Sequence, residues 1–462
     1  MTKTQTDQFD LAVIGGGPGG YVAAIRASQL GMQVVLIEKQ HLGGICLNWG
    51  CIPTKALLKS AQVAKYVKNA AKYGINTGAF ELDIKKMVER SRSVADGLQG
   101  GVRGLLKKNK VQVIEGVAKL LGGGMITILD KVIAAKNIII ATGARPRIIK
   151  GLEPDGDKIL TYKEAMMQQT IPESIAIVGA GAIGVEFASF YNALGSEVLL
   201  VEMQERILGG EDKEISDFAA KAFIKDGIAI HTKSVLKILN KQTKVLIEIS
   251  CDGKSSQHQV DKVIVATGVQ GNVEDLGLEN TKVKVQNNQI IVNEYLMTDE
   301  EGIYAIGDVI SPPWLAHKAS HEGVMCAEKI AGLRVSPILR ENIPACVYSS
   351  PQIASVGITE EKALQLGKEL KIGRFPFLAN GKALAIGESS GLVKTIFDAK
   401  TGELLGAHLV GCDVTELIAA LVVAKTAELT EHEILHTIFA HPTLSEMLHE
   451  SVLNAFGRSI HF

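Results

Sequence analysis

The stretch "FDLAVIGGGPGGYVAAIRASQLGMQVVLIE", from Phe9 to Glu38, decides the fold of the first part of the chain. An apolar run leads into Gly15, Gly17 and Gly20, and a helix-forming stretch, a second apolar run and an acid follow. The first glycine permits a tight turn, the second lets a phosphate approach the backbone, and the third lets the helix pack on the strand. The stretch therefore predicts a strand–helix–strand unit whose helix N-terminus can hold a pyrophosphate.

A second stretch repeats this pattern. "SIAIVGAGAIGVEFASFYNALGSEVLLVE" ends at Glu202, and the same distance separates its first glycine from its closing acid. Its glycines are Gly179, Gly181 and Gly184. Carboxylates such as Glu38 and Glu202 can accept hydrogen bonds from a ribose diol and would repel a 2′-phosphate. Both copies therefore favour FAD or NAD over NADP, and the alternative for each is a βαβ unit that binds no nucleotide.

Each copy has a companion strand further along the chain. "NIIIATGARP" holds Ala141, Thr142 and Gly143, and "KVIVATGVQG" holds Ala266, Thr267 and Gly268. Small residues after a buried strand let the backbone pass close to a ligand. A third segment, "GIYAIGDV", places Asp308 where an acid can hold a polar part of a flavin, or where a strand simply ends in a turn.

The segment "CLNWGC", Cys46 to Cys51, carries two cysteines with three open interpretations: buried thiols, metal ligands or a disulfide. Zinc requires about four ligands, and no second Cys or His pair lies nearby in the sequence, so we expect no metal site. Five residues of regular helix rise about 7.5 Å, which exceeds the roughly 7 Å Cα limit for a disulfide. A bridge therefore requires an irregular turn, which Asn48 and Gly50 permit. Lys55 lies about one turn into the amphipathic helix that follows, near this centre or simply in solvent.

The motif "HPTLSE" supplies a candidate base, His441. Pro442 suits the first position of a helix, and Glu446 would then lie one turn inside that helix and reach back to the imidazole. A carboxylate in this position fixes the tautomer and stabilises the imidazolium. A structural turn is the alternative role for His441, and the other candidates by residue type are His317, His321, His436 and His449.

Composition narrows the class of protein. The chain has 462 residues, 46% of them hydrophobic, and a net charge of −1, which favours neither nucleic acid nor an anionic membrane as a partner. The N-terminal segment is polar and lacks a signal peptide, and no apolar run is long enough to span a membrane. Six cysteines in a chain of this length form no disulfide framework, so we expect a cytoplasmic protein.

The motifs together resemble one family. "GGICLNWGCIPTK", both glycine stretches, "IYAIGDV", "LAHKASHEG" and "HPTLSE" occur in the order typical of the flavin disulfide reductases, the class I pyridine nucleotide-disulfide oxidoreductases. The resemblance covers essentially the whole chain. It implies an α/β fold with two Rossmann-like dinucleotide-binding domains plus a C-terminal α+β dimerisation domain. The implied domains are 1–148 (FAD-binding, with the redox disulfide), 149–272 (NAD-binding), 273–343 (central, completing the FAD site) and 344–462 (interface).

The resemblance also implies roles for the candidate residues. Cys46 would be the interchange thiol that forms a mixed disulfide with substrate, and Cys51 the thiolate that lies against the flavin. His441 would be the base, oriented by Glu446. The implied FAD contacts are Gly15, Gly17, Gly20, Glu38, Lys55, Ala118, Thr142, Gly143, Asp308 and Ala316. The implied NAD contacts are Gly179, Gly181, Gly184, Glu186, Glu202, Val235 and Gly268.

The implied activity is the reoxidation of dihydrolipoyl groups of 2-oxo-acid dehydrogenase or glycine cleavage complexes, with NAD as acceptor. The implied partners are a second copy of the chain, in a homodimer, and a lipoyl-bearing E2 or H-protein. The alternatives are a glutathione or mercuric reductase-like enzyme and a flavoprotein that only binds partners. Ile45 and Trp49 depart from the family pattern, in which threonine and valine are common at these positions.

Overall fold

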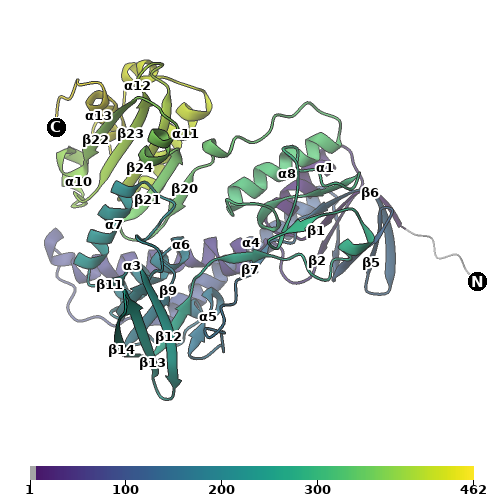
Figure 1. Ribbon diagram of the computed structural model, residues 1–462, viewed down its shortest axis with the longest axis horizontal. Helices are drawn as coiled ribbons and strands as arrows, with labels where there is room; N and C mark the ends of the chain where they lie inside the picture. The colour runs from purple at the N-terminus through teal and green to yellow at the C-terminus, as the bar shows by residue number, and fades with distance from the viewer. Residues whose placement is uncertain (1–6) are drawn as a thin grey trace, which may run out of the picture. The chain divides into compact units, whose positions relative to one another are not determined.

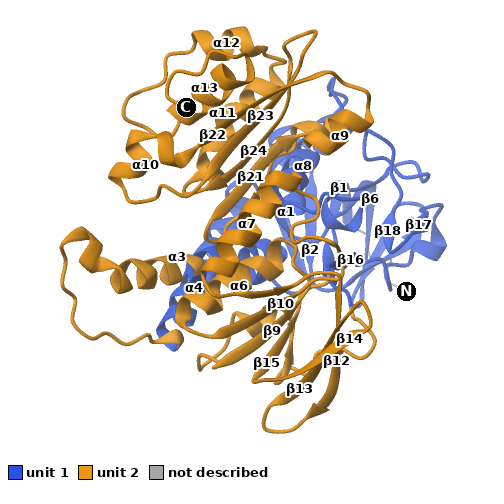
Figure 2. Cartoon of the chain, turned by 60° about the vertical axis from the view of Figure 1, so that its left-hand side comes forward, with its two compact units in different colours: residues 1–57, 85–147, 268–338 blue, residues 58–84, 148–267, 339–462 orange. Residues whose placement is uncertain are grey.

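The computed structural model describes residues 7–462. The chain forms two compact units (Figure 2). Unit 1 comprises Met1–Leu57, Lys85–Arg147 and Gly268–Ile338, and unit 2 comprises Leu58–Ile84, Ile148–Thr267 and Leu339–Phe462. The prediction that the polar N-terminal segment is no signal peptide falls mostly on residues 1–6, which lie outside the described residues. Within residues 7–462, no helix combines the length and the apolar character needed to cross a bilayer.

Unit 1 is built on a seven-stranded sheet of order β3-β2-β1-β6-β5-β4, in which β19 also pairs with β6. The ladders joining β3, β2, β1, β6 and β19 are parallel, and those joining β6, β5 and β4 are antiparallel. The strands are β1 (Asp7–Ile14), β2 (Val34–Glu38), β3 (Gln112–Glu115), β4 (Ala118–Gly122), β5 (Met125–Ile128), β6 (Lys131–Ile140) and β19 (Ile303–Ala305). Two short ladders complete the unit, β7 (Ala144–Pro146) with β16 (Val269–Gly271) and β17 (Val285–Gln286) with β18 (Gln289–Ile290).

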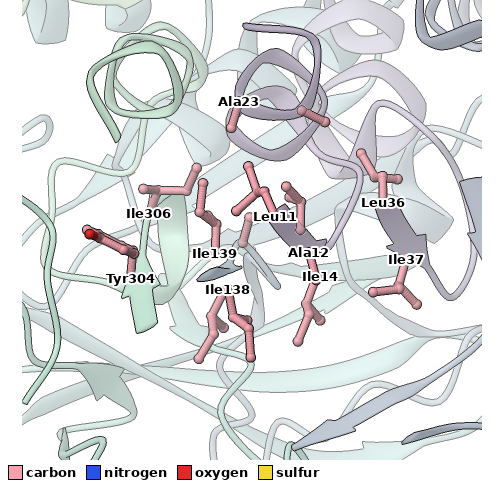
Figure 3. Packing of buried hydrophobic residues seen from close by; sticks show 14 of the residues in the cluster. Leu11, Ala12, Ile14, Ala23, Leu36, Ile37, Ile138, Ile139, Tyr304 and Ile306 are labelled. Atoms are coloured by element: carbon pink, nitrogen blue, oxygen red, sulfur yellow. The ribbon is translucent and has the colours of Figure 1, made fainter. Parts of the chain in front are cut away.

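The core of unit 1 explains why the first glycine stretch contains two almost continuous apolar runs. Parallel strands that are covered on both faces are apolar throughout, and Leu11, Val13 and Leu36 are fully buried. Figure 3 shows Leu11 and Ile139 in this core, below Ala23 of α1.

Helices α1 (Pro18–Gln29) and α8 (Ala316–Ile330) pack closely on each other in unit 1 (Figure 1). A Cβ atom on Gly323 of α8 would lie 2.5 Å from the backbone oxygen of Gly19 of α1, so the close approach of the two backbones requires glycine there. The unit also contains α2 (Gly44–Trp49) and nearly all of α4 (Ile84–Lys108). Helix α3 (Cys51–Lys68) belongs to unit 1 as far as Leu57 and to unit 2 from Leu58 on.

Unit 2 contains a five-stranded parallel sheet of order β11-β10-β9-β15-β8. The second glycine stretch forms β9, α6 and β10, as the sequence predicts. An antiparallel meander β12-β13-β14 follows in the chain. The elements are β8 (Ile159–Leu160), α5 (Tyr162–Ala165), β9 (Ser174–Val178), α6 (Ala182–Leu194), β10 (Glu197–Val201), α7 (Lys213–Lys225), β11 (Ala229–His231), β12 (Ser234–Lys241), β13 (Val245–Cys251), β14 (Lys254–Val260) and β15 (Lys262–Val265).

The C-terminal part of unit 2 is an antiparallel sheet of order β20-β21-β24-β23-β22 with helices packed on it. Its elements are β20 (Ala345–Val347), β21 (Gln352–Gly357), α9 (Glu360–Gln365), β22 (Leu370–Pro376), α10 (Gly381–Ala385), β23 (Leu392–Asp398), β24 (Leu404–Gly411), α11 (Val414–Thr426), α12 (Glu431–His436) and α13 (Glu446–Ala455). The predicted fold class is thus confirmed: two βαβ nucleotide-binding sheets and a C-terminal α+β part.

Candidate functional site

The first glycine turn is tightly packed at Gly15 and Gly20 and open at Gly17. Gly15 has φ +107°, and a Cβ atom there would lie 2.2 Å from the Ala141 oxygen. A Cβ atom on Gly20 would lie 1.9 Å from the oxygen of Gly15. Gly17, by contrast, is the extended N-cap of α1 and has open space around its Cβ position up to 4.0 Å. Only glycine fits the two packed positions, and the free N–H groups of α1 face the open one.

The second turn has the same geometry. Gly179 has φ +99°, and a Cβ atom there would lie 2.5 Å from the Ala266 oxygen. On Gly184 it would lie 1.8 Å from the oxygen of Gly179, and on Gly181 nothing lies within 4 Å. Two βαβ units with an open cradle at the helix N-terminus fit two dinucleotides, which the FAD and NAD assignment requires.

The closing acids lie beside these cradles. Glu38 Oε2 accepts a hydrogen bond from the Gly16 amide at 2.6 Å, and its Oε1 accepts one from Gln40 at 2.7 Å. Glu202 is held in the same way, by the amides of Ala180 at 2.7 Å and Gln204 at 2.8 Å. Both carboxylates are thus fixed next to the glycine turn, where a ribose bound to that turn would meet them.

Thr142 and Gly143, which follow the companion strand of the first glycine stretch, lie in unit 1. Thr142 Oγ1 donates to the Asn272 oxygen at 2.8 Å, and Asn272 Nδ2 donates back to the Thr142 oxygen at 2.8 Å. Gly143 follows with φ +69°, in the region that favours glycine. No local motif indicates Asn272, because its partner lies 130 residues earlier in the chain.

Asp308 lies in a buried polar cluster directly after β19. Burial raises the pKa of the Asp308 carboxyl, and Lys318 partly offsets this effect. Lys318 forms a 2.9 Å ion pair with Glu322, with both side chains almost fully buried, and Glu322 accepts from the Gly307 amide at 2.8 Å. A carboxyl group in such a setting is typical of a ligand-binding position. Lys318 and Glu322 belong to the motif "LAHKASHEG", whose sequence alone did not indicate this ion pair.

Three further FAD candidates are placed in the same unit. Lys55 lies half-buried in the first turns of α3, after the cysteine pair. Ala118 is buried at the beginning of β4, and Ala316 is the first residue of α8. Their roles as FAD contacts remain a proposal.

The cysteine pair is a disulfide. Helix α2 ends at Trp49, Gly50 breaks the backbone with φ −143° and ψ −111°, and α3 begins at Cys51. This break brings the Cα atoms of Cys46 and Cys51 to 4.7 Å, within the range that a disulfide requires. The irregular turn expected for a bridge is therefore present. Buried Asn48 stabilises it by donating to the oxygens of Leu42 at 3.0 Å and Gly44 at 2.8 Å.

The nicotinamide-side candidates lie around the second sheet. Glu186 is buried on α6, and its Oε1 accepts from the Tyr348 amide at 2.9 Å. Val235 lies on β12 and is 49% exposed, and Gly268 has φ +99°. Thr267 Oγ1 is shielded from solvent and has no hydrogen-bond partner within residues 7–462. A buried hydroxyl without a partner is costly, so this atom fits a ligand-facing position.

The motif "HPTLSE" differs in one respect from the prediction. Helix α13 begins at Glu446, with Ser445 as its N-cap, so the helix does not begin at Pro442. The His441–Pro442 peptide bond is cis, and Thr443 Oγ1 donates to the Ala440 oxygen, which closes a turn before the helix. The prediction that Glu446 lies one turn inside a helix is therefore wrong, because a local turn satisfies the backbone before helical geometry begins.

The contact expected between these two residues is nevertheless present. His441 Nδ1 lies 2.9 Å from Glu446 Oε1, and Glu446 Oε2 accepts from the Thr443 amide at 2.8 Å. Partial burial opposes ionisation, but the hydrogen bonds from Thr443 and His441 prevail and lower the pKa of Glu446. An ionised carboxylate accepts, so Nδ1 carries the hydrogen and Nε2 is left as the basic atom. The His441 side chain is 78% exposed.

A second His–Glu pair joins α13 to the C-terminal segment that follows it, and no local motif indicates this pair. His461 Nδ1 lies 2.7 Å from Glu450 Oε1, one turn further along α13. Of the alternative candidates, His436 and His449 contact backbone oxygens, of His432 at 2.7 Å and Leu435 at 3.2 Å. His317 and His321 lie on α8.

Comparison with known proteins gives a consistent result over the whole chain. The family described as "Pyridine nucleotide-disulphide oxidoreductase" matches residues 9–323, and its dimerisation domain matches residues 343–452. A dihydrolipoyl dehydrogenase of Zymomonas mobilis is 52% identical over 99% of this chain and 100% of its own length. One of Rhizobium etli is 50% identical over 98% and 99%. The crystal structure of LpdA from Mycobacterium tuberculosis is similar with a TM-score of 0.90, at 26% identity over 97% of this chain and 99% of that one.

Proposed function

The chain belongs to the pyridine nucleotide-disulphide oxidoreductase family, and from this premise we propose how its own residues carry out the reaction. The activity is that of a dihydrolipoyl dehydrogenase: a dihydrolipoyl dithiol and NAD⁺ give a lipoyl disulfide, NADH and a proton. FAD, when bound, accepts the electron pair from the enzyme thiols and delivers it to NAD as hydride. The observation that carries the proposal is the Cys46–Cys51 disulfide at the helix break.

We propose that Cys46 is the sulfur that exchanges with substrate. A substrate thiolate attacks Cys46 Sγ, the Cys46–Cys51 bond breaks, and Cys51 leaves as a thiolate. The second substrate thiolate then attacks the substrate sulfur of this mixed disulfide. The oxidised lipoyl ring closes, and Cys46 is released. The electron pair now resides on the two enzyme thiols, and Cys51 would be the sulfur nearer to the flavin when FAD is bound.

His441 is the proposed base. Because Glu446 holds Nδ1–H, Nε2 is free to take the proton from the substrate thiol and to keep it near the released sulfur. Glu446 remains ionised near neutral pH, since its pKa is lowered, and it stabilises the imidazolium that forms. The 78% exposure of the His441 side chain, in the turn before α13, agrees with a base that meets a substrate from outside this part of the chain.

The proposed cofactor contacts follow from the two cradles. In unit 1, the glycine turn with Glu38 would hold the FAD pyrophosphate and ribose, and Asp308 a polar part of the flavin. In unit 2, the glycine turn with Glu202 would hold NAD. Two backbone amides fix the Glu202 carboxylate. Within residues 7–462, Glu202 takes part in none of the ion pairs. A carboxylate with no cation beside it would repel a 2′-phosphate, which supports NAD over NADP.

The chain forms a homodimer through its dimerisation domain, residues 343–452. We propose that His441 and Glu446 of one subunit complete the site beside the disulfide of the other. We further propose that a lipoyl-bearing E2 or H-protein delivers the substrate. The division into 1–148, 149–272, 273–343 and 344–462 also remains a proposal, and the pairing of β19 with β6 supports a central segment that completes the FAD site. The cytoplasm is the proposed location on the basis of cysteine usage.

Steady-state assays test the function directly. With FAD-loaded protein and dihydrolipoamide, we expect fast reduction of NAD and at least a hundredfold lower kcat/KM with NADP, because a fixed carboxylate repels the 2′-phosphate. Glutathione disulfide with NADPH is the matched control for the glutathione reductase-like alternative. Turnover in that control, with none from dihydrolipoamide, would refute the proposal. No turnover with either substrate, despite bound FAD, would favour the binding-only flavoprotein.

A further inference from the structure

The ring of Trp49, between the two cysteines in the sequence, contacts a charged side chain of another helix. The Cζ atom of Arg92, on α4, lies 4.7 Å from the centroid of the Trp49 ring. The ring of His41 lies on the same tryptophan, with centroids 6.3 Å apart and planes inclined by 56°. Tryptophan gives the strongest cation–π contacts, and the planar guanidinium suits stacking.

Helix α4 also forms hydrogen bonds to residues around the disulfide, from positions before and after Arg92 in the helix. We call residues Cys46–Ala56 the redox segment. Arg90 Nη1 donates to the Ala56 oxygen at 2.9 Å, and Ser91 Oγ donates to the Pro53 oxygen at 3.2 Å. Two turns later, Gln99 Nε2 donates to Asn48 Oδ1 at 3.4 Å. Arg92 is therefore carried by a helix that is fixed to the redox segment at other points, and its position relative to Cys51 is set by that helix.

Arg92 brings a positive charge to the side of the redox segment. Burial lowers the pKa of Arg92, and Asp96, one turn along α4, partly offsets this effect. An arginine remains protonated in proteins at neutral pH even so. Trp49, on which it stacks, precedes Cys51 by two residues. A cation near a thiol favours the thiolate, and so stabilises the reduced form of a disulfide pair whose product is a thiolate.

We propose that Arg92, held on the ring of Trp49, is a positioning residue that stabilises the thiolate-bearing reduced state of the Cys46–Cys51 pair and makes this disulfide easier to reduce. The inference rests on the proposed function of that pair. The aromatic ring of Trp49 is needed for this contact, since an aliphatic side chain offers no face for a guanidinium.

A reduction potential distinguishes this role from a merely structural one. FAD-loaded protein is equilibrated without oxygen in buffers of reduced and oxidised dithiothreitol. Dithiothreitol gives up two electrons and two protons and closes its cyclic disulfide, while the Cys46–Cys51 bond breaks to give two thiols. Acid quenching, alkylation and mass spectrometry then count the free thiols at Cys46 and Cys51.

For Arg92→Gln we expect the equilibrium constant for reduction to fall about three- to tenfold, and tenfold corresponds to about 30 mV for two electrons. Trp49→Val should lower it in the same direction, and Trp49→Phe should lower it less. Arg92→Lys should recover part of the loss, because it restores the charge but not the stacked plane. The matched control is Arg103→Gln, which removes an exposed arginine on the same helix, 3.4 Å from Glu115.

An unchanged equilibrium constant in Arg92→Gln, or an equal fall in Arg103→Gln, would overturn the proposal. If wild-type protein shows no reducible Cys46–Cys51 pair at all, the proposed function fails instead. The two failures are thus distinguishable in one experiment.

Discussion

Replacing Glu446 by glutamine isolates what the carboxylate contributes to the base. The amide can still occupy the position 2.9 Å from His441 Nδ1, but it carries no charge. Opposite charges about 4 Å apart attract by about 1 kcal/mol in water and about 4 kcal/mol at an effective dielectric constant of 20. Because the His441 side chain is 78% exposed and that of Glu446 is 28% exposed, the value for this pair lies near the lower end. A loss of about 1–2 kcal/mol corresponds to roughly a five- to thirtyfold fall in kcat.

The assay is NAD reduction by dihydrolipoamide, with stopped-flow measurement of the step that follows substrate mixing. The same change one turn further along the helix, Glu450→Gln, is the control, since Glu450 forms an equivalent hydrogen bond at 2.7 Å to His461. We expect the control to keep at least half of the wild-type kcat. A Glu446→Gln enzyme within twofold of wild type, or a control that loses as much activity, would refute the assignment of Glu446 to the base.

Three further predictions concern the framework. Gly184→Ala should lower the free energy of unfolding in urea by about 1–3 kcal/mol, because its Cβ would overlap a backbone oxygen. Gly181→Ala should leave this free energy unchanged, because its Cβ position is open, and should raise the KM for NAD severalfold. Lys394→Met should cost about 3–5 kcal/mol, because it leaves the fully buried Asp212 carboxylate without its 2.8 Å partner; unchanged stability would contradict this. The pKa of Asp155 is lowered by hydrogen bonds from backbone amides and a lysine, although partial burial opposes this shift. Its ionised carboxylate therefore stabilises the fold above the ordinary carboxyl pKa, and this contribution is lost as the pH falls. Asp155→Asn should lower the free energy of unfolding by about 1 kcal/mol at neutral pH and by less in acid.

The two nucleotide-binding units were predictable because their signals are local. Gly15 and Gly179 begin turns that lead from strand to helix, and the residues around them show the expected packing. The closing acids Glu38 and Glu202 could be located by spacing alone. Their hydrogen bonds to the turn amides could not, since these depend on how β2 and β10 lie against the glycine turns.

The break at Gly50 followed from a physical limit, because regular helix cannot bring Cys46 and Cys51 close enough to bridge. The beginning of α13 was mispredicted because propensity favours Pro442 at a helix start, whereas the turn closed by Thr443 and Ala440 precedes the helix, which begins at Glu446.

Contacts between residues far apart in the chain could not be predicted from the sequence. Lys394 is fully buried in the middle of a strand, and nothing near it in the sequence indicates that Asp212, 182 residues earlier, holds it. Trp49 departs from the family pattern, which the sequence shows, but nothing in the sequence distinguishes its partner Arg92 from an ordinary arginine on a helix. Such pairs depend on tertiary packing rather than on the periodicity that locates helices and strands.

The central claim is that the electrons pass through the Cys46–Cys51 pair, and Cys51→Ser tests it most directly. Serine at Cys51 leaves the glycine cradle and Glu38 untouched, so FAD should remain bound and its visible absorbance should persist. We expect NAD reduction by dihydrolipoamide to fall at least a thousandfold, because no thiolate remains to carry the electron pair from Cys46. Near-native reduction of NAD by the Cys51→Ser protein, at full FAD occupancy, would contradict the account.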